Sequence, residues 1–218
     1  MGQKKQMLFQ KGLAILLAFS LVLGNMTVCD PGMYAYADTW DGTVTDAEDM
    51  QVDADGVYLI YTPADLAGFA QIVNEADAGV NGRLCADIDM GTDNAWTPIG
   101  NCDEGIMYSG RFEGDGHTVI LNVMEDVGLL YAGLFGGADG ATIEGVVVQG
   151  EIHSQDSAGG IVGYVDGDGA NIMQCRNEAE IHAGNGSGGI LGYLGGGAVS
   201  IEECANTGKK CCRFWCRT

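Results

Sequence analysis

Basic residues are scarce once the two ends of the sequence are set aside. Lys and Arg number ten in 218 residues, but three precede residue 38 and four follow residue 208. Residues 38–208 keep only Arg83, Arg111 and Arg176 against 29 acidic residues (all 30 except Asp30), a formal charge of −26. Such a surface repels nucleic-acid phosphates and anionic membranes, so we expect neither as a partner. The net negative charge favours solubility and does not by itself identify a partner.

Proline and histidine are also rare, with three residues of each. A hydrophobic fraction of 46% excludes a disordered chain. The 36 glycines do not recur at every third position, which excludes collagen. The histidines do not form the His-Glu-x-x-His motif of zinc peptidases, and the Gly-x-Ser-x-Gly motif of serine hydrolases is absent. We therefore assign no catalytic residue and no cofactor-binding residue.

The first 37 residues have the pattern of a Sec signal peptide. Three lysines precede an apolar run from Gly12 to Leu23, and Ala35-Tyr36-Ala37 is a small-x-small cleavage site. The apolar run is shorter than the ~20 residues that a membrane span needs. We predict cleavage before Asp38, an extracellular or cell-surface location, and no membrane insertion after cleavage.

The pattern then predicts an acidic lead-in, residues 38–57, and one helix over about 62–74. Thr62 is a suitable N-cap, Pro63 suits the first helical position, and Asp65 follows the cap by three residues. Apolar residues recur at helical spacing after Asp65. A solenoid needs a cover for its first apolar layer, and we expect this helix to be that cap.

A repeat dominates the rest of the sequence. Ile143, Ile172 and Ile201 are each 29 residues apart, and Cys175 and Cys204 keep the same spacing. The segments between them are short, β-branched and separated by turns, without a helical pattern. A fixed period of this kind predicts an all-β parallel β-helix, or β-solenoid, over residues 58–208, with regular repeats from about residue 141. We expect a right-handed solenoid in which the isoleucines form one internal ladder and the cysteines another.

Short glycine-framed segments accompany the period. They are Gly133-Leu134-Phe135-Gly136, Gly160-Ile161-Val162-Gly163 and Gly189-Ile190-Leu191-Gly192. They resemble the GLUG motif of bacterial secreted and surface proteins, and the Ile-x-x-Cys-x-Asn segments from Ile172 and Ile201 are similar to its inter-motif strand. The resemblance covers roughly residues 58–208. It implies a β-helix-like fold in an adhesin-like, extracellular setting. Such repeats also precede the peptidase domain of IgA-cleaving zinc peptidases, but no catalytic residue belongs to the repeat itself.

The last ten residues, 209–218, do not follow the repeat. They bring four basic residues and three cysteines together. We interpret this segment as the scar of a frameshift or truncation. The alternative is a genuine basic, thiol-rich tail that binds a metal or a partner, although its cysteines lack Cys-x-x-Cys spacing.

Two pairs of aspartates are the best indication of enzymatic activity in the sequence. Asp87/Asp89 and Asp166/Asp168 are spaced i, i+2, which on a strand places both carboxylates on one face, about 7 Å apart. Glycosidases use paired carboxylates, and oxygen-rich loops also bind calcium. The favoured interpretation is that these aspartates belong to turns beside glycine. A polysaccharide lyase or glycoside hydrolase, and a calcium-stabilised spacer of a larger surface enzyme, stay as alternatives.

His153 and His182 also lie one period apart, so they should stack in neighbouring coils. We favour a solvent-facing ladder over a metal site, because two histidines alone make an incomplete set of ligands. Cys85, Cys102, Cys175 and Cys204 are interpreted as free, buried thiols. The sequence thus predicts a non-catalytic scaffold and binding module, whose partner is a host or cell-surface protein or glycan.

Overall fold

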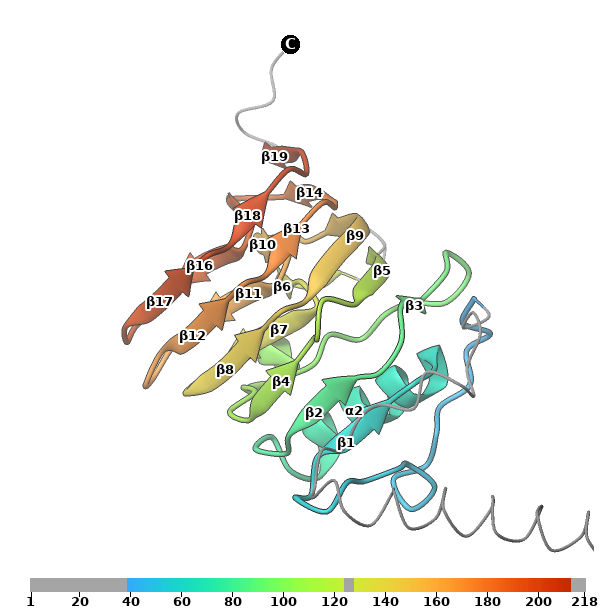
Figure 1. Cartoon of the computed structure of the whole chain (residues 1–218). Coiled ribbons are helices and arrows are strands. Elements are labelled where there is room, and N and C mark those ends of the chain that lie inside the picture. The colour runs from blue at the N-terminus through green and yellow to red at the C-terminus, as the bar shows by residue number, and fades with distance from the viewer. Residues whose placement is uncertain (1–38, 124–127, 213–218) are drawn as a thin grey trace, which may run out of the picture.

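The computed structural model describes residues 39–123 and 128–212, which form a parallel β-solenoid with one α-helix (Figure 1). The predicted signal peptide, residues 1–37, lies outside the described residues. Every pairing between named strands is parallel, and the coils stack so that each strand pairs with its counterpart one coil further along the chain. The predicted all-β solenoid is confirmed.

Four sheets make the walls of the solenoid. The six-stranded sheet contains β1 (Tyr58–Ile60), β2 (Gly82–Leu84), β4 (Arg111–Glu113), β8 (Ala141–Glu144), β12 (Ala170–Met173) and β17 (Val199–Glu202). The seven-stranded sheet contains β3 (Ile88–Asp89), β5 (Thr118–Val123), β9 (Val147–His153), β13 (Arg176–Asn177), β14 (Glu180–Ala183), β18 (Ala205–Asn206) and β19 (Lys210–Cys212). The two three-stranded sheets are β6 (Tyr131–Ala132), β10 (Ser157–Gly159), β15 (Gly186–Gly188) and β7 (Phe135–Ala138), β11 (Val162–Val165), β16 (Leu191–Leu194).

The predicted internal ladders are present. Ile172 of β12 pairs with Ile143 of β8 and with Ile201 of β17. Cys175 is buried, and its thiol donates to the carbonyls of Ile143 and Met173 at 3.7 and 3.2 Å. Cys204 makes the equivalent contacts one coil later. One repeat of sequence therefore forms one coil of the solenoid.

The glycine-framed segment is a corner between two sheets. β10 ends at Gly159, Gly160 and Ile161 make the bend, and β11 begins at Val162. The bend needs glycine because a Cβ on Gly160 would overlap the side chain of Asn177. Gly189 and Asn206 repeat this contact in the next coil. In these two coils the Ile-x-x-Cys-x-Asn segment and the glycine-framed corner thus meet through the Asn–Gly contact.

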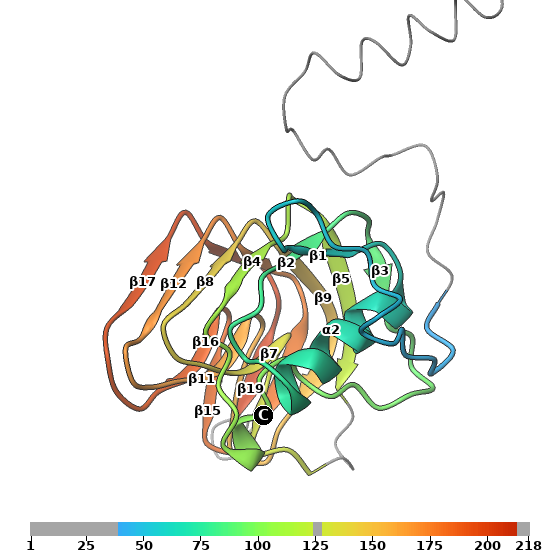
Figure 2. The same cartoon turned by 90° about the horizontal axis from the view of Figure 1, so that it is seen from below.

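Helix α2 (Pro63–Glu75) covers the first coil, as predicted (Figure 2). Thr62 and Asp65 form a capping box, in which each side chain accepts a hydrogen bond from the backbone of the other residue. Phe69 of the helix is fully buried and packs against the rings of Tyr108 and Phe112, at centroid distances of 6.2 and 5.7 Å. A short 3-10 helix, η1 (Cys102–Glu104), lies between β3 and β4.

The opposite end of the stack, at β16 and β17, is much less covered (Figure 2). Ile201 continues the internal isoleucine ladder, yet it is 46% exposed, whereas Ile143 and Ile172 are fully buried. Leu194 and Tyr193 in the same coil are 45% and 53% exposed. The core is therefore dense beside the helix and thins toward residue 201.

Two predictions need correction, one on the end of the solenoid and one on the cysteines. β19 pairs with β14 in the regular register, Ile181 with Lys210 and His182 with Cys211, so the solenoid continues beyond residue 208. Backbone pairing tolerates lysine and cysteine because strand register depends on main-chain hydrogen bonds. The rest of the predicted tail lies outside the described residues. The prediction of four free, buried thiols is also wrong at Cys85, which is half-buried and disulfide-bonded, while Cys102 and Cys204 are free but only partly buried.

Candidate binding face

The first aspartate pair is used for internal hydrogen bonding. Asp87 lies just before β3, and its carboxylate accepts from the backbone N–H of Thr118 at 2.8 Å and contacts the His117 ring at 3.2 Å. Asp89 accepts from the backbone N–H of Gly91 at 2.9 Å and from Thr39 at 3.3 Å. Both carboxylates therefore fasten neighbouring segments to the strand.

The second pair lies in the turn between β11 and β12. Asp166 accepts from the backbone N–H of Gly167 at 2.9 Å and from the Tyr164 hydroxyl at 2.8 Å. These hydrogen bonds stabilise the charged form and hold the pKa of Asp166 below its ordinary value. The backbone N–H of Asp168 donates to Asp139 at 2.6 Å. The Asp166 carboxylate is thus ionised and accepts hydrogen bonds. A general acid requires the opposite, a raised pKa.

Neither pair belongs to a group of metal-ligating side chains. Among the described residues, the one group of three or more such side chains with converging ligand atoms is Glu151, His153 and His182. Asp87, Asp89, Asp166 and Asp168 are not members of that group, since the first two lie at β3 and the other two in the turn between β11 and β12. The turn interpretation therefore fits Asp166 and Asp168, whereas Asp87 and Asp89 lie at strand β3, where they accept local hydrogen bonds.

The histidines stack as predicted. His153 of β9 pairs with His182 of β14, and their rings lie 4.5 Å apart at centroids with 10° between planes. The pair is not simply solvent-facing, because Glu151 lies beside both rings.

A ladder of tyrosines marks another face of the solenoid. Tyr164 and Tyr193 are register partners in adjacent coils, with ring centroids 5.9 Å apart and 8° between planes. Tyr131 of β6 extends the ladder, with its ring centroid 4.7 Å from that of Tyr164. The ladder becomes more exposed toward Tyr193, which presents 53% of its surface. Three rings from three coils thus form one aromatic strip along the solenoid.

A hollow of about 410 Å³ adjoins this strip. It is lined by Tyr131, Asp156, Ser157, Asn185, Gly186 and Tyr193. Asp156 and Asn185 lie one period apart, and the Asn185 amide donates to the Asp156 carboxylate at 2.9 Å. The hollow therefore combines aromatic rings with hydrogen-bonding groups that repeat from coil to coil, which is the composition of a binding site for a polar ligand with apolar faces.

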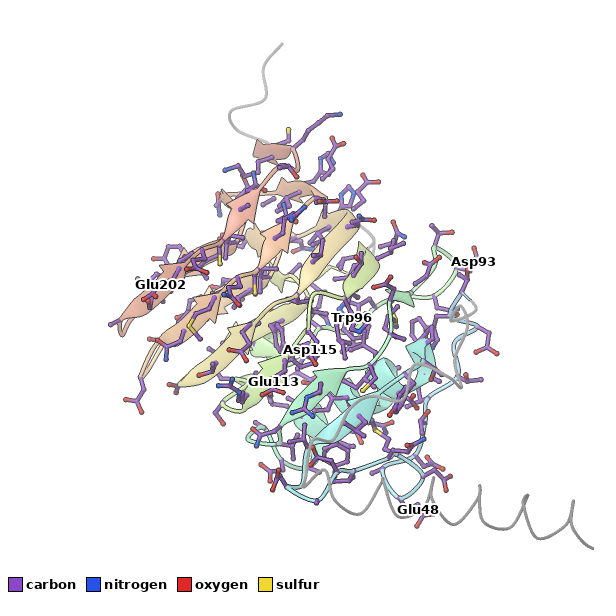
Figure 3. All side chains as sticks on the ribbon, in the orientation of Figure 1. Glu48, Asp93, Trp96, Glu113, Asp115 and Glu202 are labelled. Atoms are coloured by element: carbon purple, nitrogen blue, oxygen red, sulfur yellow. The ribbon has the colours of Figure 1, made fainter. Side chains whose placement is uncertain are left out.

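A second hollow, of about 310 Å³, lies beside α2 and is lined in part by Trp40 and Trp96. Trp96 belongs to the loop between β3 and η1 and lies beside α2, at the capped end of the solenoid (Figure 3). The polar groups here hold the cap together, since the Asn74 side chain donates to the Pro98 carbonyl at 3.0 Å and accepts from the Asn101 N–H at 2.9 Å. We assign this hollow to the junction between cap and solenoid.

The two arginines of the six-stranded sheet are already paired. Arg83 donates to Glu113 at 2.6 Å, and Arg111 donates to Glu113 at 2.8 Å and also pairs with Glu144. Glu113 of β4 and Asp115 of the turn that follows it both lie within 4 Å of the Arg83 guanidinium (Figure 3). These arginines bind acidic neighbours, so they do not form a positive clamp for an anionic ligand.

Sequence reasoning missed the tyrosine ladder. Tyr164 and Tyr193 close the glycine-framed segments one period apart, and that spacing was a usable signal. Tyr131 had no such signal, because its strand β6 is offset from β10 by 26 residues (Tyr131 with Ser157) and not by the regular period. Tyr131 and Tyr164 lie in different sheets, so the contact between their rings depends on how the chain bends between those sheets.

Comparison with family models, curated proteins and solved structures gave no match to this chain. No helix within the described residues has the length and apolarity to cross a membrane.

Proposed function

We propose that the chain is a non-catalytic repeat segment of a secreted or cell-surface bacterial adhesin-like protein, serving as an extended scaffold and binding module. The tyrosine strip and its adjoining hollow are the contact surface in this proposal. The observation that carries it is the run of three contacting rings across successive coils, in which Tyr164 stacks on Tyr193 and Tyr131 lies tilted against Tyr164.

The proposed ligand is a neutral glycan chain. Sugar rings have apolar C–H faces that pack on aromatic rings and hydroxyl edges that bond to carboxylates and amides. Asp156 and Asn185 provide the second kind of group beside the tyrosines. A net charge of −26 over residues 38–208 (three basic minus 29 acidic) opposes an acidic glycan. A strip that climbs from coil to coil suits a polymer that lies along the solenoid axis.

A neutral-glycan array with the full chain tests the proposal. Tyr193→Ala should weaken binding by about three- to tenfold, because one ring contact is lost. Tyr193→Phe keeps the ring and should bind like the wild type. Asp168→Asn, a turn residue away from the hollow, is the matched control.

Two outcomes would contradict the proposal. Binding that is unchanged in Tyr193→Ala and in Tyr164→Ala would remove the tyrosine strip as the contact surface. Product release from any glycan of the panel, abolished in Asp87→Asn or Asp166→Asn, would instead establish a carbohydrate-active enzyme.

A further inference from the structure

Three metal-ligating side chains converge on the outer face of the seven-stranded sheet. Glu151 and His153 are two residues apart in β9, so their side chains leave the same face. His182 is the register partner of His153 in β14. The parallel register of two neighbouring coils therefore brings together residues that are 29 positions apart in the sequence.

One carboxylate oxygen lies close to both imidazoles. Glu151 Oε1 is 2.8 Å from His153 Nε2 and 3.4 Å from His182 Nε2. The ligand atoms of the three residues all lie within 4.8 Å of one another. Zinc bonds to imidazole nitrogen at about 2 Å, so the two stacked rings would turn toward each other when an ion binds.

His182 supplies a second, independent observation. Its Nε2 atom is buried and makes no hydrogen bond, although oxygens of Glu151 and Glu180 each lie 3.4 Å away. Those contacts have the distance of an ion pair but not the geometry of a hydrogen bond. A buried polar atom without a partner is costly, and a bound cation would satisfy it.

We propose that Glu151, His153 and His182 bind a divalent transition-metal ion of the zinc class. Two imidazoles and a carboxylate suit Zn²⁺, whereas Ca²⁺ prefers oxygen ligands alone. The set leaves a fourth position for water or another ligand. This site is separate from the tyrosine strip and does not depend on glycan binding.

The bound ion would link two coils. β9 supplies two of its ligands and β14 the third, so the ion would fasten the coil that carries His182 to the better-buried coil that carries His153. The next coil places Cys211 in register with His182, but Cys211 is disulfide-bonded and does not offer a thiolate. Binding energy at a site formed only in the folded state adds to folding stability.

Calorimetric titration of the full chain with ZnCl₂ is the first test. We expect one ion per chain at this site, and a thermal midpoint that rises with zinc concentration. His182→Ala should lower the affinity at least about tenfold, since even loss of an outer-shell partner has an effect of that size. Glu151→Gln removes a ligand at a half-exposed position and should act in the same direction without affecting folding.

His117→Ala is the matched control, because His117 contacts Asp87 on another part of the solenoid. It should bind zinc like the wild type. Cobalt(II) substitution separates the ligand types, since a His/Glu site gives d–d bands without a sulfur-to-metal charge-transfer band. Burial raises the pKa of Cys102 to about 11 and that of Cys175 to about 12, which keeps both thiols protonated and poor competitors for the ion.

Three results would overturn the proposal. The first is an absence of zinc binding by the full chain. The second is equal affinity of the wild type, His182→Ala and Glu151→Gln. The third is a sulfur-to-cobalt charge-transfer band that persists in His182→Ala, which would place the ion on cysteines.

Discussion

Asn177 and Ser157 are the two fully buried polar residues among those that the structure describes. The Asn177 side chain is satisfied on both sides, since it accepts from the backbone N–H of Ala179 at 3.1 Å and donates to Asn206 at 2.7 Å. It also occupies the space that a Cβ at Gly160 would need. Val148 occupies the register position of Asn177 one coil earlier. Asn177 thus links its Ile-x-x-Cys-x-Asn segment to the glycine-framed corner at Gly160.

A double-mutant cycle tests this contact. Gly160→Ala should destabilise the fold by about 1–3 kcal/mol through overpacking, and Asn177→Ala by about 1–3 kcal/mol through lost hydrogen bonds. The double variant should lose less than the sum, because removing the asparagine opens space for the new methyl group. Urea unfolding gives the values.

Asn171→Ala is the control for the cycle, since Asn171 is exposed on β12. It should be additive with Gly160→Ala. Additivity of Asn177→Ala with Gly160→Ala would show that the two motifs are not coupled.

At the scale of elements, the outer face of the six-stranded sheet is held by ion pairs between strands. Glu113 of β4 receives hydrogen bonds from Arg111 on its own strand and from Arg83 on β2. Partial burial raises the pKa of Glu113, but the two guanidinium groups outweigh it, so the net shift is downward. Because the folded-state pKa is lowered, the stabilisation is present above the unfolded-state value and is lost as the pH falls through the folded-state value.

We therefore expect Glu113→Gln to reduce the difference in unfolding free energy between pH 7 and pH 3, by about 1–2 kcal/mol for a carboxylate with charged partners. The measurement is urea unfolding of wild type and variant at both pH values. Glu202→Gln is the control, since Glu202 lies on β17 of the same sheet and accepts from Ser200 (Figure 3). A pH dependence in Glu113→Gln equal to that of the wild type would contradict the assignment.

The whole molecule has a gradient of burial along its axis. α2 covers the first coil, the inward-facing Ile143 of β8 and Ile172 of β12 are fully buried, and Ile201 of β17 is 46% exposed. Each coil contacts mainly its neighbours, so the stability of a solenoid is close to a sum of nearest-neighbour terms. The last described coil should therefore open first.

Amide hydrogen exchange measures this gradient. We expect amides of β8 to exchange at least about tenfold more slowly than those of β17, with β12 between them, because opening of β17 disrupts only one interface. Uniform protection across the three strands would instead indicate a single cooperative unit. Saturating zinc should slow exchange in β14 if the metal site proposed above is present.

The sequence by itself determined the coil. A period of 29 residues, β-branched strands and a capping-box helix were enough to predict a parallel solenoid with a helical cap, because each is a local or one-dimensional property. The stacking of His153 on His182 followed from the same period. The contacts of the acidic pairs could not be read from the i, i+2 spacing, which does not show that Asp87 and Asp166 accept backbone hydrogen bonds.

Only the tertiary structure decided which residues meet across corners and coils. Tyr131 joined the tyrosine strip through an offset in one sheet, and Glu151 joined the two histidines because it leaves the same face of β9. The corner at Gly160 requires glycine because a buried asparagine from another strand fills the space beside it. These contacts depend on side-chain directions at the bends, which a repeat length does not encode.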